Sequence, residues 1–154
     1  MDNNNIFKVW GIRRRLLLTA TSEIDLVNVQ KDCFCSKHFH EHKINRFVVI
    51  SGRVQIQSEY GDVILTAKES FEVRPKLIHR FFALEDSIMI ELAFVETGNI
   101  DSDDIVRIKQ GGKIVDGKAY TLDEMKEKGM LELWDILKNW ERYAKKQEKE
   151  RKDV

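Results

Sequence analysis

Short stretches in which apolar and polar residues alternate dominate the first two-thirds of the chain. Between about residues 6 and 108, segments rich in β-branched and aromatic residues end at turn signals and recur at intervals of roughly ten residues. Clear examples are "NRFVVISG", "RVQIQS", "IHRFFAL" and "SIMIELAFV". Many short strands at even spacing are typical of a sandwich or a barrel, and not of alternating strands and helices. We therefore predict an all-β domain.

The pattern changes after "QGGK". Thr121 and Glu124 have the spacing of a capping box, which predicts that a helix begins there, and Gly129 is expected to end or bend it. The chain thus divides into a β-sandwich domain, residues 1–112, and a C-terminal helical extension, residues 113–154.

Apolar residues continue at helical spacing beyond this point, among them Leu133, Trp134 and Leu137. A helix with such a stripe buries it against another surface. We expect that surface to be the β-domain itself or the second subunit of a homodimer. A groove on another protein is the alternative.

The charge balance limits the classes of partner. The 154 residues include 26 basic and 26 acidic ones, so the formal net charge is zero. A general nucleic-acid-binding protein normally carries a basic surplus, so we expect no nucleic-acid partner. No apolar run approaches the ~20 residues that cross a membrane, and "MDNNNIFKVW" lacks the apolar segment of a secretory signal. We expect a cytoplasmic protein without a membrane partner.

Two local features have simple interpretations. The basic run "RRR" at residues 13–15 is expected to be solvated surface charge. Cys33 and Cys35 fit a reducing compartment and are expected to be ordinary thiols, since a disulfide at that spacing is strained. A thiolate pair that binds a metal is the alternative.

The histidines offer the strongest sign of chemistry. Three of the four, at residues 38, 40 and 42, lie within "SKHFHEHKIN", and the fourth is His79. On a strand, residues i and i+2 point to one side about 6.5 Å apart. Two imidazoles so placed can meet at one ion, at metal–nitrogen distances of about 2.1 Å. This pattern favours a metal site formed by His38, His40 and a ligand from another strand; a polar strand edge is the alternative.

The same residues resemble the first motif of the cupin family. In that motif two histidines one residue apart are followed by a glutamate and then a glycine. Here His38 and His40 are followed after four residues by Asn45 and, after six more, by Gly52, so the spacing is kept.

A second cupin motif joins a proline to a histidine. Pro75 and His79 resemble it, with one residue fewer between them than is common. The resemblance covers residues ~7–110. It implies a double-stranded β-helix, the cupin jelly roll, followed by the helical extension.

Four further stretches resemble the cupin domain of type II mannose-6-phosphate isomerases, which are often fused to mannose-1-phosphate guanylyltransferase. They are "KVWG", "NRFVVISG", "PKLIHRF" and "TGNIDSDDIVRI". "DDIVR" is the more specific of these, because a generic cupin does not require it. Two residues depart from that family: His38, where glutamine is usual, and Asn45, where glutamate is usual.

The resemblance implies a metal site made of His38, His40, His79 and Asn45. An amide oxygen coordinates more weakly than a carboxylate and brings no negative charge. Three neutral imidazoles suit a divalent transition metal, namely Zn, Fe, Ni, Mn or Cu. His42 is expected in a turn at the rim of the site.

In an isomerase of this type, the metal polarises a sugar carbonyl while a base moves a proton between adjacent carbons. Glu91, within "IMIELAF", is the candidate catalytic base, because burial raises the pKa of a carboxyl group. Arg46, Arg74 and Arg80 are candidates for binding a phosphate or carboxylate group. The expected substrate is therefore small, polar and anionic.

Two other functions fit the same motifs. One is a cupin dioxygenase with a three-histidine iron site. The other is a non-enzymatic module for small-ligand binding or dimerisation, which the loss of a carboxylate at Asn45 makes more plausible. The fold does not decide between them, because one fold carries many chemistries.

Overall fold

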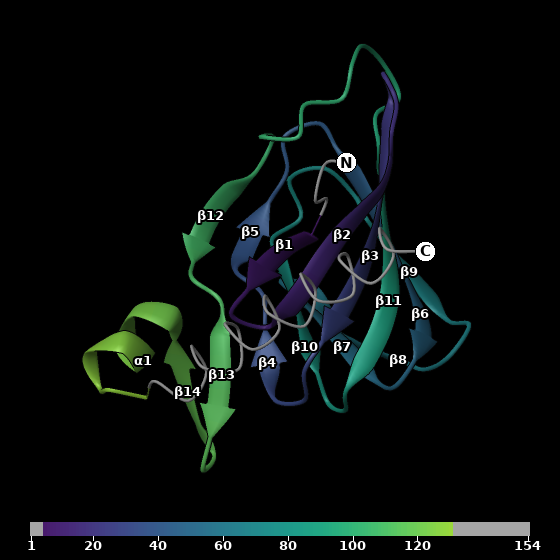
Figure 1. The fold of residues 1–154 in the computed structure, drawn as a ribbon. Coiled ribbons are helices and arrows are strands. Elements are labelled where there is room, and N and C mark those ends of the chain that lie inside the picture. The colour runs from purple at the N-terminus through teal and green to yellow at the C-terminus, as the bar shows by residue number, and fades with distance from the viewer. Residues whose placement is uncertain (1–4, 131–154) are drawn as a thin grey trace, which may run out of the picture.

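The protein consists mostly of β-strands, as Figure 1 shows. The computed structural model describes residues 5–130, and this range contains two antiparallel sheets and one short helix. No helix in it is both long and apolar enough to cross a membrane. The predicted all-β class is therefore confirmed.

The first sheet has six strands in the order β1-β2-β3-β11-β6-β9. They are β1 (Asn5–Lys8), β2 (Gly11–Leu18), β3 (Ser22–Val29), β11 (Ser87–Phe94), β6 (Ile44–Ser51) and β9 (Ser70–Val73). β11 lies near the centre, paired along its length with β3 and β6.

The second sheet follows the order β12-β5-β10-β4-β13-β14, with β7 also paired to β10 and β8 paired to β7. Its strands are β12 (Val106–Lys109), β5 (Lys37–Phe39), β10 (His79–Ala83), β4 (Cys33–Phe34), β13 (Gly112–Val115), β14 (Lys118–Thr121), β7 (Val54–Ser58) and β8 (Gly61–Leu65).

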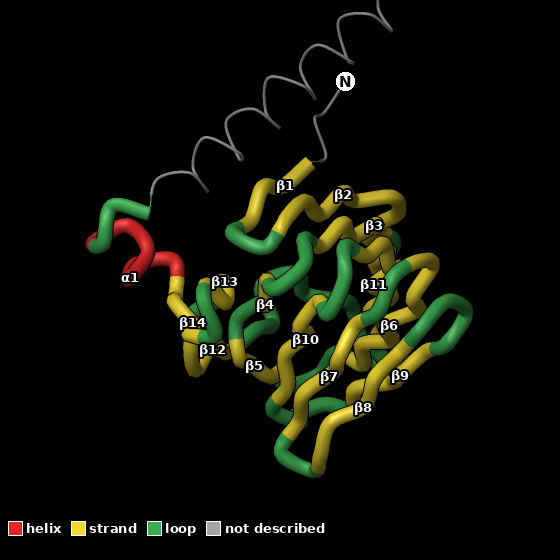
Figure 2. Tube along the Cα trace, turned by 90° about the horizontal axis from the view of Figure 1, so that it is seen from below, coloured by secondary structure: helices red, strands yellow, loops and turns green. Residues whose placement is uncertain are grey.

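The two sheets face each other, as Figure 2 shows from one end. Over residues 5–130 they do not join into a closed ring of hydrogen-bonded strands. Of the two predicted arrangements, a sandwich or a barrel, the structure shows the sandwich.

The inner faces of the sheets are divided into an apolar part and a polar part. Buried apolar side chains fill the first part; they include Val27, Val29, Phe47, Val49 and Met89 from the first sheet and Val54, Ile56, Phe81 and Ala83 from the second. Buried polar side chains occupy the second part; they include Glu23, Asp25, His38, His40, Lys43, Asn45 and His79. A polar cluster on the inner face is costly to bury unless its groups are paired or bind something, so this part is the candidate site.

The segment after residue 111 contains a β-hairpin, whereas its sequence pattern predicted only a helix. β13 and β14 form a hairpin that extends the second sheet through pairing of β13 with β4. Asp116 and Gly117 have φ angles of 50° and 76°. An Asp-Gly pair with two positive φ angles is a strong hairpin signal. The sequence "IVDGKAY" contains this pair, so the hairpin could have been predicted from it.

Helix α1 (Leu122–Glu127) begins where the capping box was predicted. The Thr121 side chain accepts a hydrogen bond from the backbone of Glu124, and the Glu124 carboxylate accepts one from the Thr121 backbone at 2.7 Å. Met125 is buried and belongs to the apolar core, so it anchors the helix beside the sandwich. Gly129, with φ of 64°, follows the helix as expected. The predicted packing face of Leu133, Trp134 and Leu137 lies outside the described residues.

Gly52 shows why its motif position requires glycine. Its φ is +88°, and a Cβ there would lie 2.5 Å from the Asp86 carbonyl oxygen and 2.3 Å from Ser87 Oγ. We predict that Gly52→Ala lowers the free energy of unfolding by about 2–4 kcal/mol, through strain and overlap with the backbone. Denaturant unfolding followed by circular dichroism measures this change.

Gly61→Ala is the matched control, because Gly61 also has a positive φ, +122°, but nothing lies within 4 Å of its virtual Cβ. Strain alone should cost it about 1 kcal/mol. Equal losses for the two variants would contradict the close approach at Gly52.

Candidate metal centre

Three histidine side chains meet between the sheets. His38 lies on β5, His40 directly follows that strand, and His79 opens β10, where it is the cross-strand partner of His38. The side chains are buried, with relative exposures of 7%, 4% and 1%. One ring nitrogen from each lies within 4.8 Å of the others. The structure thus brings together the three histidines that the sequence predicted as ligands.

Backbone carbonyl groups fix the orientation of each ring. Nδ1 lies 2.7 Å from the Ser36 carbonyl oxygen in His38, 2.6 Å from that of Asp104 in His40, and 2.9 Å from that of Leu77 in His79. A carbonyl oxygen only accepts, so Nδ1 carries the proton in each neutral ring, and Nε2 keeps its lone pair. This second contact is the one that orients metal-binding histidines in general.

The rings are held in the neutral form. Burial, and then the neighbouring His79 and His40 rings, lower the pKa of His38 to about 3. Burial lowers the pKa of His79 to about 4, and it is also the main cause of the lowered pKa of His40. At neutral pH the cluster therefore consists of three uncharged imidazoles.

Unpaired atoms indicate what the cluster lacks. His79 Nε2 and Asn45 Oδ1 are buried without a hydrogen-bond partner within residues 5–130. Each such atom costs roughly 1–3 kcal/mol, and both are acceptors for which a cation is a suitable partner. Three imidazole nitrogens are the donor set that zinc, copper, iron or nickel prefers. The residues therefore fit a divalent transition metal.

Asn45 lies at the cluster through its amide. It sits on β6 with an exposed fraction of 1%, and its Nδ2 is 3.2 Å from His40 Nε2 and 2.9 Å from Glu91 Oε1. The amide thus links a histidine of the cluster to a carboxylate. His42, by contrast, is exposed and is not part of the cluster.

Asp104 ties the loop before β12 to the turn that follows His40. Its carboxylate oxygens accept hydrogen bonds from the backbone amides of Glu41, His42 and Lys43, at 2.8, 2.9 and 3.0 Å. These three bonds help to lower its pKa. Its backbone carbonyl is the one that accepts from His40 Nδ1. One residue of "DDIVR" therefore positions both the turn and a histidine of the cluster.

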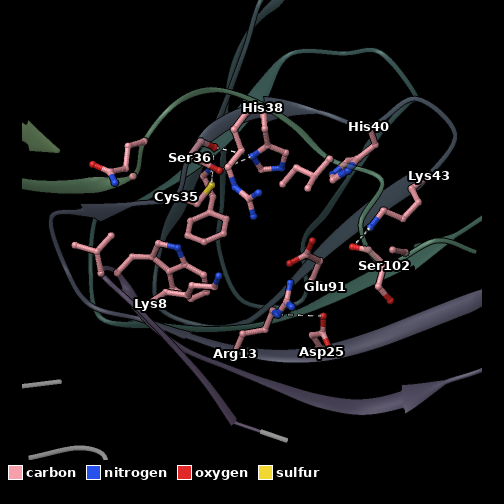
Figure 3. A pocket seen from close by; sticks show the side chains of 18 of the residues that line it. Lys8, Arg13, Asp25, Cys35, Ser36, His38, His40, Lys43, Glu91 and Ser102 are labelled. Atoms are coloured by element: carbon pink, nitrogen blue, oxygen red, sulfur yellow. Dashed lines mark hydrogen bonds and ion pairs between the residues drawn. The ribbon is translucent and has the colours of Figure 1, made fainter. Parts of the chain in front are cut away.

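A cavity of about 1190 Å³ opens beside the cluster. Figure 3 shows Glu91 projecting into it below His38 and His40. Glu91 is on β11, directly opposite Asp25 on β3. Burial raises the pKa of Glu91 to about 7, an effect opposed by Arg13 and reinforced by Asp25. The carboxylate predicted as a base thus lies in the cavity with a pKa in the range of a general base.

An ion-pair network surrounds this carboxylate. Arg15 bonds to both Asp25 and Glu23, and Lys43 Nζ lies 3.5 Å from Glu23. These charges lie on the inner face of the first sheet, where Glu23 and Asp25 are only 4% exposed. Buried charges are tolerated when they are paired in this way.

Besides Lys43 and Lys109, three basic residues line the cavity: Lys8, Arg13 and Arg107. Burial and then the charges of Arg13 and Arg107 lower the pKa of Lys8. Within the described part of the chain, Lys8 and Arg107 form no ion pair, and Arg13 has only a 3.6 Å contact with Asp25. We call these three residues the cationic group.

The arginines expected to bind an anion lie elsewhere. Arg46 and Arg74 both pair with Glu72, at 2.9 and 3.0 Å, and Arg80 donates to Gln57. None of them lines the cavity beside the histidines. Their role in binding substrate stays a prediction.

Sequence reasoning missed the cationic group and the ion-pair network. The run at residues 13–15 was expected to be solvated, but the Arg13 and Arg15 side chains reach the inner face. The available signal was parity: Glu23 and Asp25 alternate in phase with the buried Val27 and Val29. Charged residues in phase with a buried face need partners there.

The cysteines are free thiols, as predicted. Burial raises the pKa of Cys33 to about 11 and that of Cys35 to about 12. Burial thus disfavours the thiolate form of both side chains.

Comparison with protein families finds one match. The family described as mannose-6-phosphate isomerase C-terminal matches residues 2–110 of this chain. A sequence search of curated proteins finds no match.

Solved structures with the same fold are similar to this chain at low identity. KdgF from Halomonas sp. is 22% identical, over 56% of this chain and 81% of its own, with a TM-score of 0.52. Pac13, a nucleoside dehydratase from Streptomyces, is 13% identical, over 75% and 89%, with a TM-score of 0.60. A double-stranded β-helix protein from Klebsiella pneumoniae is 17% identical, over 71% and 84%, with a TM-score of 0.54. These similarities confirm the predicted double-stranded β-helix.

We predict that Asp104→Ala loosens the turn after His40. The change removes three hydrogen bonds to backbone amides, and bonds to a charged acceptor are worth about 1.5–3 kcal/mol each, although they do not add fully. The free energy of unfolding should fall by about 2–4 kcal/mol, and amides 41–43 should exchange with solvent faster. Hydrogen exchange with mass spectrometry or NMR measures both effects. Asp103→Ala is the control, because no side-chain hydrogen bond of Asp103 holds that turn; a similar result for both variants would contradict the assignment.

We also predict that the metal-free protein loses stability on acidification. His38 and His79 bind protons in the unfolded chain below about pH 6.5 but stay neutral in the fold down to about pH 4 or below. The unfolded state thus binds more protons, so stability falls with decreasing pH, by up to about 1.4 kcal/mol per pH unit for each histidine. Unfolding curves between pH 7 and 4 measure the slope.

His38→Gln should make that slope shallower, while the same change at the exposed His42 should leave it as in the natural sequence. An unchanged slope in His38→Gln would show that its burial in the neutral form is not what destabilises the fold in acid.

Proposed function

The chain belongs to the mannose-6-phosphate isomerase C-terminal family of cupin domains, and from this premise we propose that it is a metal-dependent isomerase acting on a small, anionic, sugar-phosphate-like substrate. The observation that carries the proposal is the composition of one cavity. It holds neutral histidines, a carboxylate with a raised pKa and the cationic group.

The cationic group supports an anionic substrate. The charged form of Lys8 is disfavoured mainly by burial and then by repulsion from Arg13 and Arg107, which lowers its pKa. A phosphate or carboxylate group bound there would relieve this repulsion and accept charge-assisted hydrogen bonds. Arg107 also lies near enough to His38 to lower its pKa, so an anion at Arg107 would place the rest of a small molecule beside the histidines.

Glu91 supports proton transfer on that molecule. In an aldose–ketose isomerisation the carboxylate takes a proton from the carbon next to the carbonyl and returns it to the former carbonyl carbon. One proton moves between the two oxygens at the same time, so the reaction consumes no oxidant or other reactant. A divalent cation held by His38, His40 and His79 would polarise the carbonyl oxygen and so acidify that carbon–hydrogen bond. Zn, Fe, Ni and Cu suit the three imidazole nitrogens, and Mn, which prefers oxygen ligands, is the fifth candidate.

We further propose that the protein works as a cytoplasmic homodimer. Leu16, Leu17 and Leu18 on β2 are 51%, 46% and 57% exposed. A run of exposed leucines supports an interface with a second subunit.

The test is an isomerase assay with hexose phosphates and each candidate metal. We expect aldose–ketose conversion, with Arg107→Gln raising KM about tenfold or more while kcat changes little, because the arginine binds the anion and not the reacting carbons. At a metal concentration that saturates the variant, Glu91→Gln should lower kcat by about 100-fold or more, because the proton acceptor is lost. Arg14→Gln is the matched control, since Arg14 is exposed and does not line the cavity.

Three outcomes would contradict the proposal. Oxygen uptake with iron but no isomerisation would favour the dioxygenase. Release of water from the substrate would favour a dehydratase, the activity named for Pac13. Neither turnover nor metal binding would favour a non-enzymatic binding module.

A further inference from the structure

The charge of the histidine cluster does not balance that of a divalent cation. Three neutral imidazoles and the Asn45 amide carry no charge. A cation in so buried a position, with exposed fractions of 1–7% for these side chains, needs a nearby negative charge. A carboxylate outside the cluster could supply this charge to a metal ion, whose binding the proposed function requires.

Glu91 is the carboxylate that is connected to the cluster. Its Oε1 accepts a hydrogen bond from Asn45 Nδ2 at 2.9 Å, and the same nitrogen is 3.2 Å from His40 Nε2. Glu23 and Asp25, the other carboxylates of this inner face, bond to Arg15, and Glu23 acts on His40 only through its charge, without a hydrogen bond. One amide thus joins the histidines to one negative charge.

Strand register fixes this connection. Asn45 on β6 is the cross-strand partner of Ala93 on β11, and Glu91 lies two residues earlier on the same strand and face. The side chains of Asn45 and Glu91 are therefore diagonal neighbours, a separation that side chains of this length can bridge. The contact follows from the sheet and not from a mobile loop.

The Asn45 amide also controls the lone pair of His40. Nδ2 can only donate, so in this arrangement it occupies the Nε2 lone pair of His40, while Oδ1 has no partner among the described residues. A cation that takes this lone pair displaces the Nδ2 contact and leaves Nδ2 with its bond to Glu91. Asn45 is thus a positioning residue between a ligand and a counter-charge.

We propose that Asn45 and Glu91 act as one unit in metal binding, in which Glu91 supplies the negative charge that the histidine cluster lacks and Asn45 connects it to His40. The inference rests on the proposed metal site, but it does not depend on the substrate or the reaction. It predicts that exchanging the two groups, so that residue 45 carries the carboxylate and residue 91 the amide, leaves the metal affinity unchanged.

The experiment exchanges the two functional groups by isosteric substitutions. Glu91→Gln removes the charge and keeps the shape, and it should weaken binding of Co²⁺ about tenfold or more. Adding Asn45→Asp to this variant places the carboxylate on residue 45, which contacts His40 directly. Residue 91 then carries the amide, which can donate to that carboxylate. The double variant should bind Co²⁺ within about threefold of the natural sequence. Competition with a chelating dye measures the affinity, and the visible absorption of bound Co²⁺ reports the ligand set.

Glu23→Gln is the matched control, because it removes a carboxylate of the same face that Arg15 and Lys43 neutralise and that forms no hydrogen bond to the cluster. Its Co²⁺ affinity should stay within about threefold of the natural sequence. Thermal unfolding of each metal-free variant checks that the fold is retained; if Glu91→Gln does not fold, Asn45→Asp alone should bind Co²⁺ more tightly than the natural sequence, because both carboxylates are then present.

Three results would overturn the proposal: unchanged affinity in Glu91→Gln, equal losses in Glu91→Gln and Glu23→Gln, or failure of Asn45→Asp to restore binding. Because Co²⁺ binding is measured without substrate, these results are separate from a failed isomerase assay. Intact Co²⁺ binding that follows the exchange, with no isomerisation, would leave this inference standing and remove only the proposed reaction.

Discussion

The need to pair buried polar groups governs the arrangement of this protein. Each histidine of the cluster meets that need on one side by donating Nδ1–H to a backbone carbonyl, of Ser36, Leu77 or Asp104. Those carbonyls belong to the ends of strands and loops, where the sheet ladder does not use them. Of the opposite ring nitrogens, His40 Nε2 contacts Asn45 Nδ2, while His79 Nε2 has no hydrogen-bond partner among the described residues, an arrangement that suits a cation.

The polar part of the sandwich interior stabilises the fold less than its apolar part does. The apolar part of the sandwich, around Val27, Phe47 and Met89, is buried to within 1% exposure and supplies the core. The polar part replaces apolar contacts by ion pairs such as those of Arg15 with Glu23 and Asp25, which add little net stability once desolvation is included. Natural proteins commonly accept such a cost at functional sites.

Loops far apart in the chain contribute to the same centre. Asp104 lies 64 residues beyond His40, yet its carbonyl orients that ring and its carboxylate holds the turn after it. Arg107 on β12 follows three residues later and reaches the cavity. The "DDIVR" stretch therefore has two physical roles at the cavity. Asp104 orients a histidine ring, and Arg107 supplies a positively charged side chain.

The sequence alone determined what depends on local periodicity. A period of two placed His38 and His40 on one side, alternation predicted the strands, and Thr121 with Glu124 marked the start of α1, because each of these depends on residues a few positions apart. The tertiary structure decided the rest. Whether Arg13 faces solvent or the cavity, and whether Asn45 meets Glu91, depend on the register between strands that are distant in sequence, which no local pattern specifies. The sequence therefore predicted the histidine cluster, while the contact of Asn45 with Glu91 and the position of the basic residues that line the cavity became visible only in the folded sheets.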